Sequence, residues 1–523
     1  MTSTGLELWE SDEKEHFESY FRDRLWGTLT MMKFLIFDKK SWLKHLSLDL
    51  ETGLDPPGIK LRAAQGLAAA DFLVPGYWVW GPIIKNLGSI GYDPSNLYMA
   101  SFDWRLSISD LEKRDRYFSS LKESIEKSFG FSGTKAVIIT HSFGSLVFLS
   151  FISWVTETDS SWVDSHIHAF VNICGPLLGV PKTISSLISG DMKDTAQLGI
   201  FESALVESLL SRKERAYLFR RWPCLLNMLP KGGSLVWSED PVVYLSNGEK
   251  LKLDEAVQKL LIDSNILPPG TSKRIASAYK LNNTKLWPNP LESPLPNAPN
   301  LTIYSFYGVG KETEIGYYYK INQDLFSNGT ILEMLQRCQD PKDLIHCIFE
   351  EMDIEFADFL LPLVVDTSFE DQDKKVVNGV ILGDGDGTVP LRSLGLMGAH
   401  FWKTSRLNPF GVKIVTREYL HEPISMIFLP GRGGPKTSDH VDILGNHEIT
   451  FDILRIVSGN EGYESNIDPD LDPVHISLVK GNMSHLAEDI SENEASGVLY
   501  EQDVTCDSKY PQNAIDSISC YDG

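Results

Sequence analysis

Cysteine is scarce in this sequence, and the cysteines that occur are far apart. The 523 residues contain only six, namely Cys174, Cys224, Cys338, Cys347, Cys506 and Cys520. This number and spacing exclude a disulfide scaffold, and no pair forms a CxxC motif or another zinc-binding spacing. The twelve histidines include no HExxH motif. His166 and His168 precede a strand-like run, where a structural role is favoured over metal binding. The sequence therefore carries no signature of a metal site.

Positive charge is also in deficit. The chain has 48 Lys and Arg against 71 Asp and Glu, a net charge of −23. Residues 461–523 hold 14 acidic residues against Lys480 and Lys509, so about half of the excess lies in this short C-terminal segment. Neither part has the basic character of a nucleic-acid-binding protein. Because the segment 461–523 is acidic and poor in large apolar residues, we expect a disordered tail.

Long apolar runs are nearly absent. The first residues, 1–15, are acidic and lack the apolar stretch of a signal peptide. Only 136–155 approaches the length of a membrane span, and His141, two serines and a glycine in its middle argue against that interpretation. We expect neither a signal peptide nor a transmembrane segment in this chain.

The segment 136–155 fits a different structure better. It opens with the β-branched run Val137 to Ile139, breaks at His141-Ser142-Phe143-Gly144, and continues as an apolar helical segment. A strand, a tight turn with serine at its apex and a helix form a nucleophile elbow, although Thr140 stands where the first glycine of the motif is usual. Ser142 is then a candidate nucleophile, and the Phe143 amide a candidate oxyanion donor. The alternative is an ordinary turn serine in a core strand–helix unit.

Further strands and helices alternate along the chain. Strand-like runs lie at 97–106, 169–175, 301–307, 376–382 and 411–419, and a helical pattern capped by Ser109 covers 109–129. This alternation predicts a mostly parallel α/β sheet. From 176 to 300, helical pieces are joined by Pro- and Gly-rich links, which is typical of an inserted cap or lid. We expect core segments at 1–175 and 301–460, the cap at 176–300 and the acidic tail at 461–523.

One of two neighbouring acidic residues and one histidine complete a candidate triad. An α/β-hydrolase presents its serine, acid and histidine in that chain order, each on a turn after a strand. Ser142, then Asp384 or Asp386, then His440 follow this order. His421 and His447 match the position of the base less well than His440, because one lies just beyond a strand and the other inside a helix. Ser142 would attack an acyl carbonyl with His440 as general base. Trp78 and Trp80 are candidates for lining an acyl pocket, with aromatic core packing as the alternative.

Several motifs together resemble one family. They are Leu50-Glu-Thr-Gly-Leu-Asp-Pro-Pro-Gly58, Phe102-Asp-Trp-Arg-Leu106, Thr140-His-Ser-Phe-Gly-Ser145, Gly190-Asp-Met-Lys-Asp194, Gly385-Asp-Gly-Thr-Val-Pro390 and His440-Val-Asp-Ile-Leu-Gly445. Over about residues 3–459 the chain resembles the lecithin:cholesterol acyltransferase-like family, in its fungal and plant phospholipid:diacylglycerol acyltransferase branch. The resemblance implies an α/β-hydrolase fold with Ser142, Asp386 and His440 as the triad, and an Asp103–Arg105 salt bridge.

The same resemblance implies a function. It implies an acyltransferase that works at a membrane surface without a metal or organic cofactor. An acyl chain would pass from a phospholipid through acyl-Ser142 to diacylglycerol, giving triacylglycerol and lysophospholipid. The implied setting is the endoplasmic reticulum, where four Asn-X-Ser/Thr sequons, at Asn282, Asn300, Asn328 and Asn482, would permit glycosylation. Alternatives are a phospholipase A or a sterol acyltransferase that uses the same triad, and an inactive lipid-binding protein or truncated gene product.

The start of the chain departs from the family pattern. The resemblance implies a buried strand ending in Val-Pro-Gly before Ser3 and a membrane-spanning helix further upstream, and neither precedes Ser3 here. In the family, residues just after this Pro-Gly supply one oxyanion-hole amide. We therefore expect the first family strand to be missing from the segment 1–175, and Met1 to Thr4 to provide that amide from the end of the chain.

Overall fold

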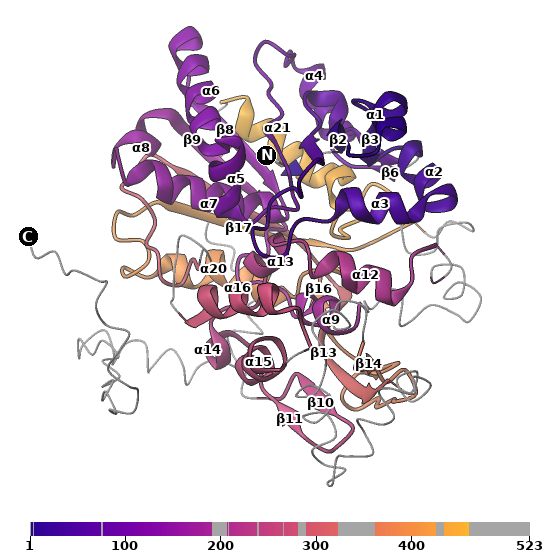
Figure 1. The fold of residues 1–523 in the computed structure, drawn as a ribbon. Coiled ribbons are helices and arrows are strands. Elements are labelled where there is room, and N and C mark those ends of the chain that lie inside the picture. Colours follow the sequence, from indigo (N-terminus) through magenta and orange to yellow (C-terminus); the bar gives the residue numbers. More distant parts are fainter. Residues whose placement is uncertain are drawn as a thin grey trace, which may run out of the picture. The chain divides into compact units, whose positions relative to one another are not determined.

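A parallel sheet forms the centre of the fold. The computed structural model describes residues 2–3, 5–74, 77–190, 207, 209–237, 240–264, 266–280, 289–322, 361–424 and 433–459 (Figure 1). Within them, four parallel strands stand in the order β17-β12-β9-β8: Lys413–Leu420, Thr302–Val309, Ile167–Ile173 and Ala136–His141. The middle strands are nearly continuous runs of buried apolar residues, as expected when helices cover both faces of a parallel sheet.

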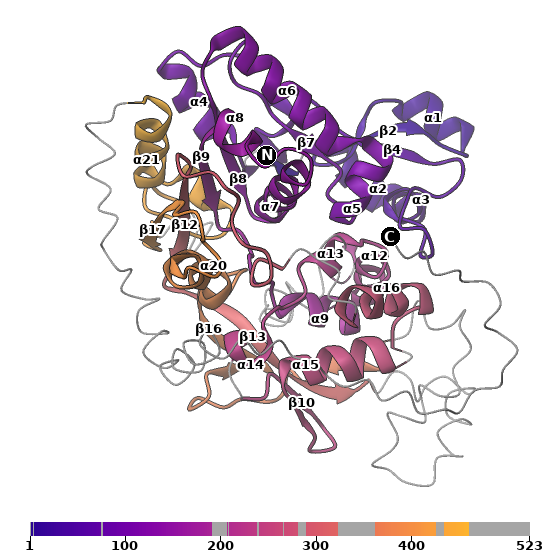
Figure 2. The ribbon, with the colours of Figure 1, turned by 90° about the vertical axis from the view of Figure 1, so that its left-hand side faces the viewer.

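Helices pack along this sheet. α6 (Tyr117–Ser132), α7 (Phe143–Thr156) and α8 (Trp162–His166) lie against β8 and β9, and α20 (Leu391–Ala399) lies against β12 and β17. α21 (His447–Val457) follows the last loop and contacts α4 (Gly81–Ser89), as Figure 2 shows. Mixed helices and strands around a parallel core are consistent with the α/β class that the sequence predicts.

The first hundred residues add a small layer beside the core. β2 (Leu6–Glu10) pairs with β3 (Arg24–Trp26) and β4 (Lys60–Ala63) in an antiparallel sheet. Two further pairs are β1–β7 (Thr2–Ser3 with Ser101–Phe102, parallel) and β5–β6 (Phe72–Val74 with Tyr77–Trp78). Three helices and a 3₁₀ turn complete the layer: α1 (Lys14–Tyr20), α2 (Leu29–Phe37), α3 (Lys39–Leu46) and η1 (Leu67–Ala69).

A second sheet joins distant parts of the chain. Its strand order is β11-β10-β13-β16-β15, with β14 also on β13: Lys250–Leu251, Val243–Leu245, Lys311–Ile321, Val380–Gly385, Val376–Val377 and Leu363–Val365. β10 comes from the segment expected to form the cap, yet it pairs in parallel with β13 of the following segment. The remaining elements among the described residues of 176–300 are helical: α9 (Lys182–Ser189), α12 (Arg212–Phe219), α13 (Cys224–Asn227), α14 (Gly233–Trp237), α15 (Leu253–Ala256), the π-helical turn η2 (Val257–Asp263) and α16 (Pro269–Lys280).

Three expected elements differ from the structure. The strand expected over 97–106 is only the two-residue strand β7 (Ser101–Phe102). The helix expected over 109–129 is two helices, α5 (Ile108–Asp115) and α6, separated by Arg116 with φ of 52°, and the N-cap is Ser107 rather than Ser109. The single strand expected at 376–382 is a hairpin of β15 and β16, because Asn378 and Gly379 both adopt positive φ and reverse the chain. Short 3₁₀ turns, η5 (Phe401–Lys403) and η6 (Asp442–Gly445), follow α20 and His440.

The structure bears on the expected absence of a membrane span but not on the expected acidic tail. None of the helices in the described ranges combines the length and apolar character that a membrane crossing requires. The stretch 136–155, which has the length of a span, is divided between β8 and α7. The expected acidic tail, 461–523, lies outside the described residues.

Candidate active site

Ser142 occupies the turn between β8 and α7, as the elbow motif predicts. Its backbone has φ of 54° and ψ of −128°, a conformation that non-glycine residues rarely adopt, and its amide donates to the Ile173 carbonyl at 2.9 Å. Phe143 is the first residue of α7, where amide groups lack intrahelical acceptors and the helix dipole is positive. The turn thus presents a hydroxyl next to a helix N-terminus.

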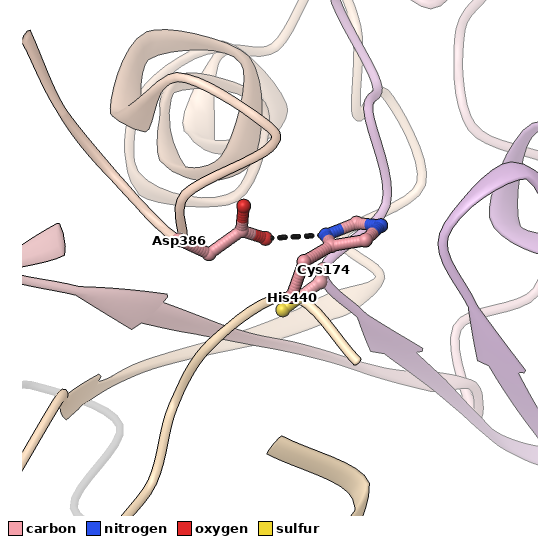
Figure 3. Close-up of side chains that lie close together, drawn as sticks. All are labelled: Cys174, Asp386 and His440. Atoms are coloured by element: carbon pink, nitrogen blue, oxygen red, sulfur yellow. Dashed lines mark hydrogen bonds and ion pairs between the residues drawn. The ribbon is translucent and has the colours of Figure 1, made fainter. Parts of the chain in front are cut away.

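His440 lies between Ser142 and Asp386. Its Nε2 is 2.8 Å from Ser142 Oγ, and its Nδ1 is 2.6 Å from Asp386 Oδ2, the contact drawn in Figure 3. A carboxylate only accepts hydrogen bonds, so Nδ1 carries the proton and Nε2 presents its lone pair to the serine hydroxyl. The structure therefore brings together three side chains separated by up to 298 positions in the sequence.

The two candidate acids make different contacts. Asp386 is fully buried, and its Oδ1 accepts from the amides of Thr388 (2.9 Å) and Val389 (2.7 Å), which leaves Oδ2 for His440. Asp384 has other partners, and its Oδ1 accepts from the amides of Gly310 (2.7 Å) and Gly385 (2.8 Å). Asp386 is therefore the acid that touches the imidazole, and Asp384 holds the end of a strand.

The competing histidines have other partners. The Nδ1 of His421 accepts from the amide of Ser438 at 3.0 Å, so this ring supports the loop that carries His440. His447 is the first residue of α21. Away from this loop, His166 stacks on Trp162 with ring centroids 4.6 Å apart. None of the three contacts the Ser142 hydroxyl in the hydrogen bonds of the described residues.

Cys174 lies beside the Asp386–His440 pair (Figure 3), and thiol, carboxylate and imidazole groups are all potential metal ligands. The ligand atoms of Cys174, Asp386 and His440 lie within 4.8 Å of one another. However, burial and the nearby Asp386 charge raise the pKa of the Cys174 thiol well above its usual value, so it stays protonated. Metal binding requires a thiolate, and Asp386 is already committed to two amides and an imidazole. These residues suit a hydrogen-bonded relay better than a metal centre.

One residue of the site was not singled out from the sequence. His141, directly before Ser142, is buried, and its Nε2 lies 2.7 Å from the main-chain carbonyl oxygen of His440. A histidine next to a candidate nucleophile was the signal in the sequence. Its partner is 299 positions away, so the sequence could not reveal the contact.

The two tryptophans proposed for an acyl pocket have unequal positions. Trp80 is buried, and its ring meets that of His141 edge-on with centroids 6.4 Å apart. Trp78 is 59% exposed and contacts Phe72. Only Trp80 lies near the site, and a role for either residue in binding an acyl chain stays a prediction.

A buried group of charges ends β7. Arg105 Nη2 lies 2.7 Å from Asp103 Oδ2 and 3.0 Å from Asp55 Oδ1, and Arg114 contacts both acids. Burial alone would raise the pKa of Asp103, but Arg105 and Arg114 outweigh it and hold this pKa at about 2. The group joins the 50–58 motif to β7 and α5. The expected second oxyanion donor among Met1 to Thr4 stays a prediction, because Met1 and Thr4 lie outside the described residues.

Comparison with known proteins finds one matching family model and several similar proteins. The family model described as lecithin:cholesterol acyltransferase matches residues 20–249 and 245–447. The chain is 41% identical to a phospholipid:diacylglycerol acyltransferase of Schizosaccharomyces pombe, over 88% of this chain and 71% of that protein. It is 36% identical to the Saccharomyces cerevisiae protein of the same description (88% and 69% covered), and 32% identical to phospholipid:diacylglycerol acyltransferase 1 of Arabidopsis thaliana (89% and 80% covered).

Proposed function

Because this chain belongs to the lecithin:cholesterol acyltransferase family, we propose that it transfers an acyl chain from a phospholipid to the free hydroxyl of diacylglycerol. The products are triacylglycerol and lysophospholipid. The observation that carries this proposal is the identity to phospholipid:diacylglycerol acyltransferases over most of the chain. The hydrogen-bonded Ser142, His440 and Asp386 support it, because acyl transfer through a serine needs a nucleophile, a base and an acid in this order.

The first half of the proposed reaction acylates Ser142. Its Oγ attacks the ester carbonyl carbon of the phospholipid while His440 Nε2 takes the hydroxyl proton. Asp386 stabilises the imidazolium that forms and keeps the proton on Nδ1. The Phe143 amide donates to the oxyanion of the tetrahedral intermediate. As the intermediate collapses, the ester C–O bond breaks, His440 returns the proton to the leaving oxygen, and lysophospholipid departs.

The second half repeats these steps with a new hydroxyl. Diacylglycerol gives its hydroxyl proton to His440 Nε2, and its oxygen attacks the acyl-Ser142 carbonyl. The Ser142–acyl bond breaks, the proton returns to Ser142 Oγ, and triacylglycerol leaves. Water can follow the same course and would give a free fatty acid, so exclusion of water from acyl-Ser142 decides between transfer and hydrolysis.

The proposal includes the fold and its division into segments. We assign the parallel sheet and its elbow to an α/β-hydrolase core, and 176–300 to an inserted cap. The strand–turn–helix at Ser142 and the acid and histidine on later loops support the core assignment. β10 of the cap segment pairs with β13 of the following core segment. The boundary near residue 300 therefore divides the sequence, but both segments contribute strands to the second sheet.

The proposed substrates lie in a membrane, and one exposed surface suits contact with it. α2 has the sequence Leu-Thr-Met-Met-Lys-Phe-Leu-Ile-Phe, and Phe34 is its one buried residue. Leu29, Ile36 and Phe37 are 60%, 57% and 84% exposed. An exposed apolar helix surface of this kind is typical of a site that binds a membrane or another protein. We propose that α2 contacts the lipid surface.

An endoplasmic-reticulum setting forms part of the proposal through the sequons. Asn300 is exposed just before β12, where an oligosaccharyltransferase can reach it. Asn282, Asn328 and Asn482 lie outside the described residues. A loss of apparent mass on treatment with an N-glycosidase would support the endoplasmic-reticulum setting. The part of this loss that comes from Asn300 should be missing in Asn300→Gln. An unmodified Asn300 in protein from a eukaryotic host would contradict it.

A product analysis tests the function. Purified protein is incubated with phosphatidylcholine carrying a labelled acyl chain, with and without diacylglycerol, and the labelled lipids are separated. We expect label in triacylglycerol only when diacylglycerol is present, and none with Ser142→Ala. Label in free fatty acid at the same rate with or without diacylglycerol would contradict the transferase and indicate a phospholipase A. Label in a sterol ester, formed only when sterol is added, would indicate a sterol acyltransferase.

A further inference from the structure

We propose that His141 is a positioning residue, whose Nε2–H group donates to the main-chain carbonyl oxygen of His440 and so holds the general base beside Ser142. The inference rests on the proposed function, because it takes Ser142 and His440 as reacting partners. It concerns a residue whose hydrogen bond is to the main chain of His440 and not to a reacting atom.

The geometry connects His141 to both the nucleophile and the base. It is the last residue of β8, so its backbone leads directly into Ser142. Its Nε2 lies 2.7 Å from the His440 carbonyl oxygen, and the two imidazole rings are 5.0 Å apart with a tilt of 44°. The Trp80 ring also meets the His141 ring edge-on, with centroids 6.4 Å apart. The ring is therefore fixed by packing as well as by its hydrogen bond.

The chemistry of the pair defines the tautomer. A carbonyl oxygen only accepts hydrogen bonds, so His141 carries its proton on Nε2. Burial, together with the nearby His440, lowers the pKa of His141 to about 3. The ring is therefore neutral near pH 7, and its low pKa makes it a much weaker base than an ordinary imidazole, poorly suited to take a proton from Ser142 in place of His440. A neutral donor is suited to positioning.

Other elements also contact the loop that carries His440. The His440 amide donates to the Asp386 carbonyl oxygen at 2.9 Å, and Lys311 forms an ion pair with Asp439. The Ser438 amide donates to His421. Of these contacts, only the bond from His141 comes from the strand that bears the nucleophile. Loss of its donor would free the His440 peptide from β8 while leaving the other tethers in place.

A small displacement of the base is costly. Misplacing a catalytic group by about 1 Å can cost roughly 10²-fold in rate. We expect His141→Phe, which keeps a ring but removes the donor, to lower kcat by about 10- to 100-fold with KM for phospholipid within about threefold. His141→Gln retains an N–H donor and should recover most of the rate.

The experiment measures the reactivity of Ser142 directly. An alkyl fluorophosphonate is attacked by a serine Oγ at phosphorus, so that a P–O bond forms, the P–F bond breaks and fluoride leaves, while His440 takes the proton. The labelling rate of folded protein is compared for the wild type, Ser142→Ala, His141→Phe and His141→Gln, together with kcat, KM and the melting temperature. The matched control is His45→Phe, because His45 is also buried and its Nδ1 donates to the Ser41 carbonyl at 2.8 Å, in a different part of the fold.

The expected result separates positioning from stability. His141→Phe should be labelled at least about tenfold more slowly than the wild type, and His141→Gln within about threefold of it. His45→Phe should melt at a lower temperature while its folded fraction is labelled at the wild-type rate. If His141→Phe does not fold, His141→Asn, whose amide is too short to reach the His440 carbonyl, replaces it in the comparison with His141→Gln.

Two results would overturn the inference. One is wild-type labelling of the donorless variant. The other is equal slowing in His141→Gln and the donorless variant, which would show that the imidazole itself, and not its donor, matters. Failure of the wild type to be labelled at Ser142 would overturn the proposed function, and the positioning role with it.

Discussion

At the scale of single residues, the neighbouring carboxylates of Asp384 and Asp386 have different hydrogen-bond partners. One accepts from two glycine amides at the end of β16, and the other accepts from the His440 imidazole. We expect Asp386→Asn to lower kcat by roughly 10⁴, the loss seen when an aspartate of a serine triad becomes asparagine and disturbs the histidine tautomer. Steady-state acyl transfer measures it.

Asp384→Asn is the matched control. Its amide oxygen can still accept from the Gly310 and Gly385 amides, so we expect a loss of less than about fivefold, the size of one weakened hydrogen bond. An inactive Asp384→Asn beside an active Asp386→Asn would reverse the assignment. The spacing of the two acids left the choice open in the sequence, and only the family resemblance favoured Asp386.

At the scale of elements, the charge group around Asp103 fastens β7 to its neighbours. Asp103 and Arg105 are both fully buried. Asp103→Asn leaves Arg105 and Arg114 with one carboxylate fewer, and we expect a loss of about 3–5 kcal/mol in the free energy of unfolding. Urea denaturation at pH 7 measures it. Asp115→Asn, which removes a partly exposed partner of Arg114, should cost less than about 1 kcal/mol.

The same group predicts a pH dependence. The pKa of Asp103 is about 2 in the folded chain against 3.8 ordinarily, so the carboxylate favours the folded state above about pH 4. This contribution decreases as the pH falls from 4 toward 2, where Asp103 becomes protonated in the folded state as well. The difference in unfolding free energy between the wild type and Asp103→Asn should shrink over this range. A constant difference down to pH 2 would show that charge does not stabilise the group.

The exposed face of α2 gives a second prediction at this scale. Replacing Ile36 and Phe37 by serine removes side chains that we expect to enter a lipid surface. Since burial of one such side chain contributes about 1.5–3 kcal/mol, vesicle binding should weaken by at least about tenfold. Sedimentation with phosphatidylcholine vesicles that contain diacylglycerol measures it. Phe131→Ser, at a side chain of α6 that is 93% exposed, is the control, and equal losses in both variants would contradict a specific contact through α2.

Elements could be predicted where the signal is local. The strand, turn and helix around Ser142 follow from residues that are adjacent in the sequence. The alternation of strands and helices predicts a mostly parallel sheet, but the order β17-β12-β9-β8 could not be predicted. The hairpin at Asn378-Gly379 also had a local signal, since this dipeptide is the common two-residue hairpin turn. The cap at Ser107 instead of Ser109 differs because serines stand at both positions, and only the backbone decides which one begins the helix. The pairing of β10 with β13 depends on contacts between distant segments.

At the scale of the whole molecule, the acidic C-terminal segment is expected to contribute little to the core. Residues 461–523 combine 14 acidic residues with few large apolar ones, so they can bury little apolar surface. We expect deletion of 460–523 to change the melting temperature by less than about 2 °C, the effect of well under 1 kcal/mol in a domain of this size. Acyl transfer should also be nearly unchanged. A substantial loss of either would show that the segment packs on the core.

The site as a whole could be predicted further than the contacts that support it. The order Ser142, then Asp384 or Asp386, then His440 is readable because each residue follows a strand-like run. The bond from His141 to the His440 carbonyl and the ion pair of Lys311 with Asp439 are not readable, since they join residues from separate strands and loops. The residues of the proposed triad therefore have local signals in the sequence, whereas the contacts that position them depend on the folded chain.

The most direct test of the account is to trap the acyl-enzyme. Protein is mixed with phosphatidylcholine in the absence of diacylglycerol, quenched with acid within milliseconds to seconds, digested, and analysed by mass spectrometry. We expect the peptide that contains Ser142 to gain the mass of one acyl chain, and addition of diacylglycerol before the quench to remove that mass with equal formation of triacylglycerol. An acyl group on another residue, or triacylglycerol formation without any acylated Ser142, would contradict the account.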